Sequence, residues 1–201
     1  MVKDHYEALQ YVLKAAKDQH LFNPKFIQTI ASLVMKNTGS VVKTILGDFD
    51  VSKGDFRKTN VVAGSERFVN YDKVVPMIKQ LCKLLDSKIN KLSTRQEILT
   101  LAFDAHFDLV SVHPFGDGNG RCSRLVMNYI EAYHNEVLTI VFKEDKAEYI
   151  KALMETRDKA DLSIFRTFMC HQHIKLLKSE IDKIAKLQRS GDQHTGYSLL
   201  F

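Results

Sequence analysis

The chain has 201 residues, enough for one domain with a substantial hydrophobic core. Hydrophobic residues make up 45% of the chain and charged residues 26%, which is typical of a globular protein. The sequence contains no run of about 18 apolar residues, so we do not expect a membrane span. The net charge is +5, but lysines and arginines are mixed with acids along the chain, which argues against a nucleic-acid partner. Three widely spaced cysteines and the lack of an apolar leader favour a cytoplasmic protein.

Apolar residues recur at helical spacing through most of the chain. Two helix starts carry explicit signals, which are Asn23 before Pro24 and the capping box Thr94-x-x-Glu97. The predicted helices cover residues 5–17, 24–37, 72–85, 95–112, 119 onward, 145–160 and 162–189.

One segment departs from this helical pattern. Residues 60–63 and 67–69 carry β-forming side chains on either side of a turn at 64–66, which predicts a short hairpin. A hairpin this small is marginal alone, so we expect it to pack on the helices. The sequence therefore predicts an all-α helical bundle with one β-hairpin. We expect a single domain over residues 1–190 and a loose tail over 191–201.

The most unusual stretch is HPFGDGNGR at residues 113–121, which holds three of the nine glycines. Pro114 predicts the end of one helix, and helical periodicity resumes at Asn119. The stretch is therefore a helix–loop–helix junction whose second half is a helix N-terminus, a natural anion site. Gly118 and Gly120 would let a phosphate approach the backbone.

Several side chains around this junction suit phosphate chemistry. Arg121 and Arg124 are one helical turn apart and can face the same anion. Asp117 can hold Mg²⁺ beside substrate phosphates, or it can serve as a helix cap or ion-pair partner. His113 suits a general base, since imidazole titrates near neutral pH, but it can also simply cap the preceding helix. An EF-hand is excluded because Arg121 occupies a ligand position.

The same residues resemble a known signature. Residues 113–121 followed by Arg124 meet every specified position of HPFx[D/E]GNGRxxR, the signature of Fic-domain proteins. The preceding segment GDFRKTNVVAGSERFVNYDKVVP resembles the lead-in and flap of that family, and EDKAEYIKALMETRD resembles the segment after the signature helix. The resemblance covers about residues 25–175 and implies a Fic-type helical bundle with a β-hairpin flap.

The resemblance implies an adenylyltransferase that moves AMP from ATP, with Mg²⁺, to a Tyr, Ser or Thr hydroxyl of a target protein. The implied roles are general base for His113, magnesium ligand for Asp117, anion hole for Gly118, Asn119 and Gly120, β- and γ-phosphate binding for Arg121 and Arg124, adenine contact for Tyr149, and target-binding flap for Val61, Val62, Ala63 and Gly64. Tyr149 can equally be a core residue, and the flap an ordinary surface hairpin.

Two other functions stay open at this point. A kinase-like enzyme would bind ATP reversed and transfer its γ-phosphate, or the same site would transfer another phosphate-containing group. Relatives of the kinase-like kind replace Gly118 and Gly120, whereas both are glycine here. A non-catalytic module that binds a nucleotide or partner is disfavoured because His113 and Asp117 are both present.

Many Fic proteins carry an inhibitory motif, [S/T]xxxE[G/N]. Ser32 is followed at the required spacing by Lys36 rather than Glu, and Ser93 to Glu97 is followed by Ile98. Neither stretch meets the motif. Three alternatives remain: regulation by a separate antitoxin-like chain, regulation by oligomerisation, or no regulation. The sequence identifies neither the target protein nor the preferred nucleotide.

Overall fold

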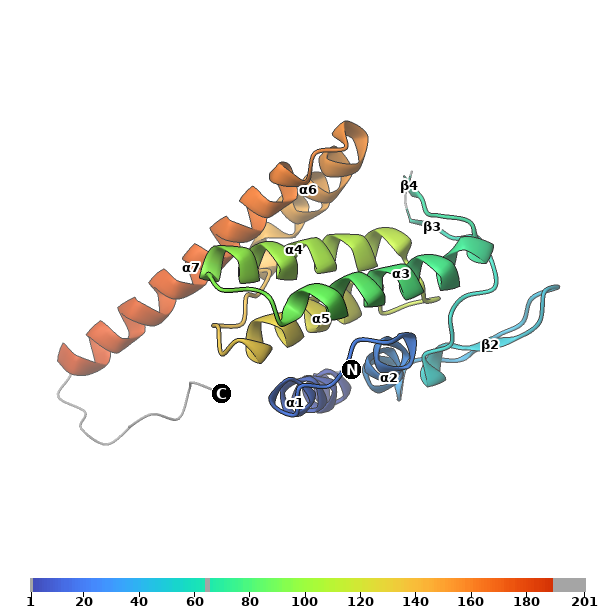
Figure 1. The fold of residues 1–201 in the computed structure, drawn as a ribbon, viewed down its shortest axis with the longest axis horizontal. Coiled ribbons are helices and arrows are strands. Elements are labelled where there is room, and N and C mark those ends of the chain that lie inside the picture. Colours follow the sequence, from blue (N-terminus) through green and yellow to red (C-terminus); the bar gives the residue numbers. More distant parts are fainter. Residues whose placement is uncertain (1, 64–65, 190–201) are drawn as a thin grey trace. The chain divides into compact units, whose positions relative to one another are not determined.

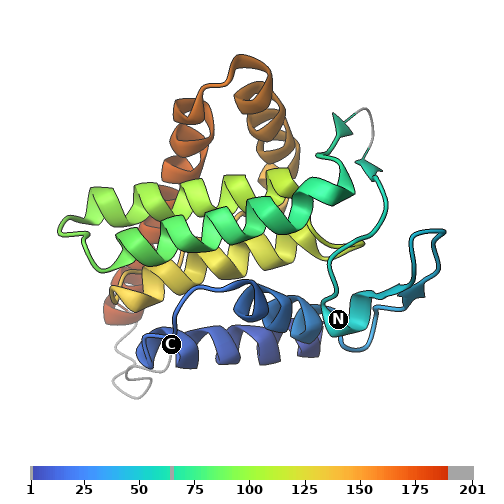
Figure 2. The same ribbon diagram turned by 45° about the vertical axis from the view of Figure 1, so that its right-hand side comes forward.

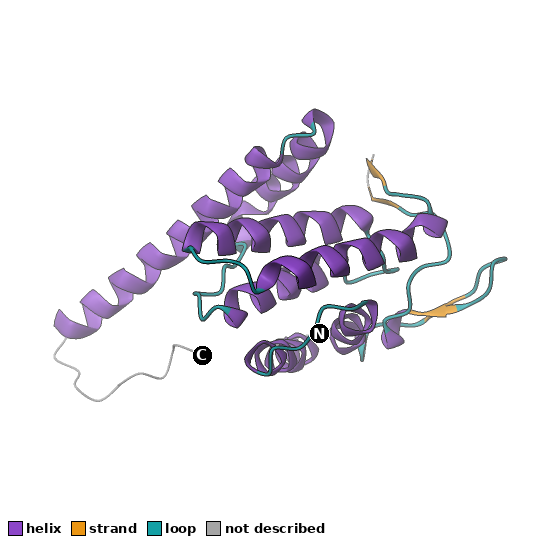
Figure 3. Cartoon of the chain, in the orientation of Figure 1, coloured by secondary structure: helices purple, strands orange, loops and turns teal. Residues whose placement is uncertain are grey.

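The structure is a computed structural model that describes residues 2–63 and 66–189. The chain divides into two compact units, Met1–Leu138 and Thr139–Phe201. Figure 3 shows that helices dominate the described residues, so the all-α prediction is confirmed. The tail expected over 191–201 lies outside the described residues, and the single domain expected over 1–190 stays a prediction.

The first unit is a bundle built around one central helix. Its helices are α1 (Val2–Lys17), α2 (Pro24–Met35), α3 (Tyr71–Ile89), α4 (Arg95–Val112) and α5 (Asn119–Tyr133). Helix α5 packs against α4, α1 and α2, and Figures 1 and 2 show it between α4 and α1. Side chains of α5 from Leu125 to Ile130 are buried around most of the helix, as a central position requires.

Both predicted helix starts are present. The Asn23 side chain accepts a hydrogen bond from the Phe26 backbone N–H at 2.9 Å, and Pro24 opens α2. At α4 the capping box is complete, since Thr94 Oγ1 accepts from the Glu97 N–H at 3.2 Å and Glu97 Oε2 accepts from the Thr94 N–H at 2.9 Å. These caps satisfy backbone donors that a helix start leaves without intrahelical partners.

The predicted hairpin is present and shorter than expected. Strand β3 (Val62–Ala63) pairs antiparallel with β4 (Glu66–Arg67), with Val62 opposite Arg67. A second strand pair was not predicted: β1 (Val41–Val42) lies antiparallel to β2 (Phe49–Asp50), which leads into the 3₁₀ turn η1 (Val51–Lys53). Strands of two residues are too short to show the alternation on which strand prediction depends.

The second unit is a helix pair. After the 3₁₀ turn η2 (Lys143–Asp145), α6 (Lys146–Lys159) packs against α7 (Leu162–Arg189). Phe165 and Met169 of α7 are buried. Within this unit, Thr139 Oγ1 and His173 Nδ1 are hydrogen-bonded at 2.8 Å. Across both units, the described helices include none with the length and apolar character needed to cross a membrane.

The capping box gives a test of how α4 is stabilised. Thr94→Ala should lower the free energy of unfolding by about 1 kcal/mol, because the Glu97 N–H loses its acceptor. Thr94→Ser keeps the hydroxyl and should cost much less. Urea unfolding followed by circular dichroism would measure both, and equal losses in the two variants would contradict this role for the hydroxyl.

Candidate active site

His113 ends α4 and is held on two sides. It has left-handed backbone angles of φ 51° and ψ 57°, and its N–H bonds to the Leu109 carbonyl. The imidazole stacks on the Phe68 ring with centroids 3.9 Å apart, and Nδ1 lies 3.2 Å from the Val110 carbonyl oxygen. A proton on Nδ1 would donate to that carbonyl and leave Nε2 as the acceptor. His113 is therefore a helix cap, and its ring is also oriented as a base requires.

A buried arginine holds the backbone at this point. Arg57 is 2% exposed. Its Nε donates to the His113 carbonyl at 2.8 Å, and its Nη1 and Nη2 donate to the carbonyls of Thr59 at 2.7 Å and Val69 at 2.5 Å. Its own backbone N–H donates to the Pro114 carbonyl at 2.9 Å. Arg57 thereby ties the end of α4 to both sides of the hairpin.

The charge of Arg57 is balanced by backbone dipoles. A further bond, at 3.4 Å, joins Nη2 to the Val112 carbonyl, so all its described side-chain bonds go to carbonyl oxygens. The last carbonyls of α4 form the negative end of the helix dipole, which favours a cation there. Burial lowers the pKa of Arg57, although a guanidinium keeps its proton in proteins. The sequence offered Gly54-x-Phe56-Arg57 only as part of a resemblance, without a role.

The loop after His113 is fixed from inside. Phe115 is 1% exposed and stacks on Phe56 with centroids 5.5 Å apart. The side chain of Asn119 bonds twice to the Phe115 backbone: Oδ1 accepts from its N–H and Nδ2 donates to its carbonyl, each at 2.9 Å. Because both ends of that amide are engaged within the protein, only the backbone N–H of Asn119 is suited to an anion hole.

Two glycines at the start of α5 differ in what they require. Gly118 has φ +82°, which favours glycine, and a Cβ there would lie 2.9 Å from Met35 Sδ, so the methionine side chain would also have to shift. A Cβ on Gly120 would lie 3.6 Å from Arg124 Nη1, an ordinary contact. Gly118 is the N-cap and offers no side-chain cap, which leaves this helix end suited to an anion.

Charged side chains gather around the same helix end. Arg121 Nη1 lies 3.4 Å from the Val34 carbonyl, and Nη2 lies 3.5 Å from Asp117 Oδ2. The Arg124 guanidinium lies beside Gly120 in the first turn. Asp117 Oδ1 accepts from the Gly118 N–H at 2.6 Å, while its side chain is 70% exposed. Two cations and one exposed carboxylate thus surround the start of α5.

This donor set fits magnesium only together with a substrate. Among the described residues there is no group of three His, Cys, Asp or Glu side chains that could hold a metal ion. Mg²⁺ commonly takes one or two carboxylates and completes its shell with phosphate oxygens and waters. A single exposed carboxylate such as Asp117 beside a phosphate site matches that chemistry.

The predicted flap and adenine contact lie elsewhere in the chain. Val61 is half-exposed, Val62 is 62% exposed, Ala63 ends β3, and Gly64 lies outside the described residues. Tyr149 belongs to α6 of the second unit, where it is 7% exposed and its ring lies 6.2 Å from that of Phe165. It is therefore packed within its own unit, and its contact with adenine stays a prediction.

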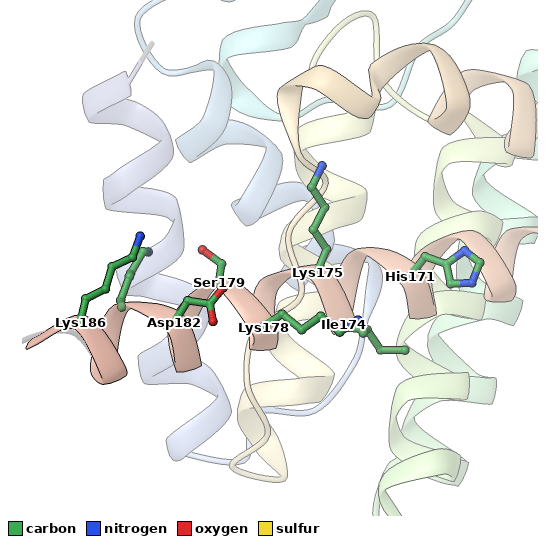
Figure 4. A pocket seen from close by; sticks show the side chains of 8 residues that line it. His171, Ile174, Lys175, Lys178, Ser179, Asp182 and Lys186 are labelled. Carbon is green, nitrogen blue, oxygen red and sulfur yellow. The ribbon is translucent and has the colours of Figure 1, made fainter. Parts of the chain in front are cut away.

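A separate hollow of about 670 Å³ runs along α7, and Figure 4 shows the side chains that line it. All of the described lining residues belong to α7, and none belongs to the predicted site. Two of its lysines are already paired: Lys175 lies 2.6 Å from Asp145, and Lys183 lies 2.6 Å from Glu180. The hollow is therefore distinct from the signature loop.

A family model matches the part of the chain that contains the signature loop. The model of the Fic/DOC family matches residues 21–130, which include the buried arginine, the hairpin, the signature loop and most of α5. The chain belongs to the Fic/DOC family.

Curated Fic relatives extend beyond this chain. It is similar to "Protein adenylyltransferase Fic" of Aedes aegypti, 29% identical over 142 residues that cover 68% of this chain and 27% of the relative. It is also similar to "Protein adenylyltransferase fic-1" of Caenorhabditis elegans, 30% identical over 158 residues that cover 75% and 30%. The chain thus spans less than a third of the length of these relatives.

Solved Fic structures share the fold. A Fic-domain signaling protein from Bacteroides thetaiotaomicron superposes with a TM-score of 0.71 at 18% identity, covering 88% of this chain and 68% of that one. Fic-1 from C. elegans, residues 134–508, gives 0.69 at 22% identity, covering 89% and 51%. BepC from Bartonella tribocorum, solved with bound AMPPNP, gives 0.57 at 18% identity, covering 85% and 86%.

The contacts of Arg57 predict that even a conservative substitution of this residue destabilises the protein. Arg57→Lys should lower the free energy of unfolding by about 2 kcal/mol or more, because one ammonium cannot reach all of these carbonyls and some stay buried without a donor. Arg95→Lys is the matched control: Arg95 is exposed and pairs with Glu136 at 2.9 Å, so it should cost less than about 1 kcal/mol. Urea unfolding measures both. We call Arg57 and its carbonyl partners the clamp. If Arg57→Lys lowered the free energy of unfolding no more than the control does, the clamp would not have the role given to it here.

Proposed function

We propose that this Fic protein is an adenylyltransferase that transfers AMP from ATP to a Tyr, Ser or Thr hydroxyl of a target protein. One observation carries the proposal: an oriented imidazole, that of His113, ends α4 shortly before Gly118, whose helix start has no side-chain cap. The names of the curated relatives support the same chemistry.

In this proposal His113 removes the proton from the attacking hydroxyl. With its Nδ1 proton directed at the Val110 carbonyl, Nε2 takes up the proton as the new bond to the α-phosphorus forms and pyrophosphate leaves. The Phe68 ring restricts the imidazole to one plane, so the base does not have to be oriented in each cycle. A positioned base of this kind typically contributes about 10²–10⁴ in rate.

The start of α5 would hold the phosphates. The backbone N–H groups of Asn119 and Gly120 and the positive end of the helix dipole favour phosphate oxygens. The Gly118 N–H, which donates to Asp117 Oδ1, would join them when that carboxylate turns toward the metal ion. Arg121 and Arg124 would contact the β- and γ-phosphates and oppose the charge that develops on the leaving pyrophosphate. The two glycines leave room for an α-phosphate, which favours AMP transfer over a reversed, kinase-like binding mode.

Asp117 would hold Mg²⁺ against the phosphates, since its carboxylate is exposed beside the helix start. Bound Mg²⁺ would neutralise phosphate charge and orient the phosphate oxygens for in-line attack. The ion contact between Asp117 and Arg121, at 3.5 Å, is long enough for the carboxylate to turn toward a cation.

The hairpin would bind the target protein. A target segment in extended conformation can add to a short exposed strand through main-chain hydrogen bonds, and β3, which is Val62–Ala63, is such a strand. In this proposal Val61 and Gly64, on either side of β3, would also contact the target. Tyr149 would contact adenine, and we expect the protein to act in the cytoplasm. Control by a separate antitoxin-like chain stays an alternative within the same proposal.

Labelled ATP tests the reaction. With Mg²⁺ and lysate as target source, label at the α-phosphate should appear on protein and label at the γ-phosphate should not. His113→Ala should reduce transfer by at least about 10²-fold while ATP still binds, since the base is absent and the phosphate site intact. Protein label from the γ-position alone would show a kinase-like transfer. Binding without label from either position would favour the non-catalytic module.

The glycines give an independent test. Gly120→Ala should leave the free energy of unfolding equal to the parent or up to about 1 kcal/mol higher, because the methyl group has room and alanine favours a helix. AMP transfer should nevertheless fall about 10²-fold, since the methyl group displaces the phosphate. Gly118→Ala should instead unfold more readily, owing to φ +82° and Met35. Full activity of Gly120→Ala would show that phosphate does not approach α5 there.

A further inference from the structure

The first turn of α1 lies beside the candidate phosphate site. Helix α1 packs against both α2 and α5. Asn37, just after α2, donates to Asp4 Oδ1 at 2.5 Å, and Arg121 of α5 reaches the Val34 carbonyl near the end of the same helix. The end of α2 thus joins the first turns of α1 and α5, and His5 lies in this first turn of α1.

The imidazole of His5 has bonding capacity that the described residues do not use. The side chain is half-buried, and its buried Nδ1 has no hydrogen-bond partner among the described residues. Native proteins rarely leave a buried polar atom in that condition without a ligand or water to meet it. We therefore expect this nitrogen to bind a partner other than the described residues.

The charges around His5 are mainly positive. Burial, and next to it the charges of Arg124 and Arg121, lower the pKa of His5 below its ordinary value of 6.5. The acids of its own helix are engaged elsewhere: Asp4 bonds to Asn37, and Glu7 pairs with Lys36, just after α2, at 3.1 Å. Without a ligand, these surroundings therefore disfavour the protonated form of His5.

We propose that His5 is a third cationic contact of the nucleotide site and binds the terminal phosphate of ATP as an imidazolium. The inference rests on the proposed function, since it places the polyphosphate between α1 and the two arginines of α5. A bound polyphosphate offsets the arginine charges and offers an oxygen to the unpartnered nitrogen. Both effects favour the protonated ring.

Nucleotide binding is then linked to pH. The pKa of His5 rises on binding, so its contribution is fully present below the pKa of the free protein and is lost as pH rises through the pKa of the complex. Binding between these two values takes up a proton. Nearby His106 of α4 cannot supply this effect, because burial, with a smaller effect from Arg124, lowers its pKa to about 3.

Calorimetry of the full chain tests the linkage. The probe is Mg²⁺ with an ATP analogue whose α- and β-phosphates are joined by a methylene group, so that no AMP is transferred. Titrations at pH 7 in buffers of different ionisation enthalpy give the protons taken up, and titrations across about one pH unit on either side of neutrality give the slope of affinity. The γ-phosphate itself titrates near pH 6, so the quantity compared is the difference between the parent chain and His5→Gln.

The parent should take up more protons than His5→Gln, by up to about one, because a single imidazole is removed. The affinity of the parent for the analogue should also fall more steeply with rising pH than that of His5→Gln. The extra fall should be at most about tenfold per pH unit, because a single proton is involved. His171→Gln, on the exposed face of α7, is the control and should match the parent. Thermal unfolding of all three chains shows whether each is folded.

Equal proton uptake and equal slopes in the parent and His5→Gln, with binding retained, would overturn the role of His5 and leave the proposed adenylyltransferase in place. A uniform loss of affinity at every pH would do the same, because a purely structural histidine has no linkage to protons. Failure of the folded parent to bind the analogue would overturn both proposals.

Discussion

The site depends on one buried guanidinium. Arg57 joins its own segment before the hairpin to two other stretches of chain: the end of α4 with the first residue of the signature loop, and the far side of the hairpin at Val69. Buried carbonyls without donors are costly, so these pieces cannot separate without leaving several unsatisfied groups at once. Because the His113 carbonyl is one of the acceptors, the backbone of the candidate base is fixed by an interaction outside the signature.

Residues of the signature fall into two groups by what their polar atoms contact. Asn119 and the Gly118 turn serve the loop itself: the amide is fully used on Phe115, and the glycine fits against Met35. The arginines of α5 and the first N–H groups of that helix have bonding capacity left for a ligand. A site that is fixed by one set of residues and open through another is preorganised, which lowers the entropic cost of binding.

Most of the fold could be predicted from local signals, and the exceptions have physical reasons. The helix starts at Asn23 and Thr94 are set by side chains adjacent in sequence, so a cap motif predicts them. The pairing of β1 with β2 rests on two residues per strand, below any periodic signal. The side-chain partners of Arg57 lie up to 56 residues away, and no spacing in the sequence shows them. The signature predicted the site residues, whereas the clamp that positions His113 required the structure.

The charges at the start of α5 favour binding of an anionic ligand, and without a ligand they do not stabilise the fold. Arginine in the first helical turn faces the positive end of the dipole, and the two arginines also share one small region with a half-buried histidine. Asp117 offsets part of this charge, but it is exposed and its contact with Arg121 is long, so that pair contributes little. A protein under selection for stability alone would place acids here. A bound polyphosphate reverses the balance, because the same cations and the same dipole then stabilise the complex.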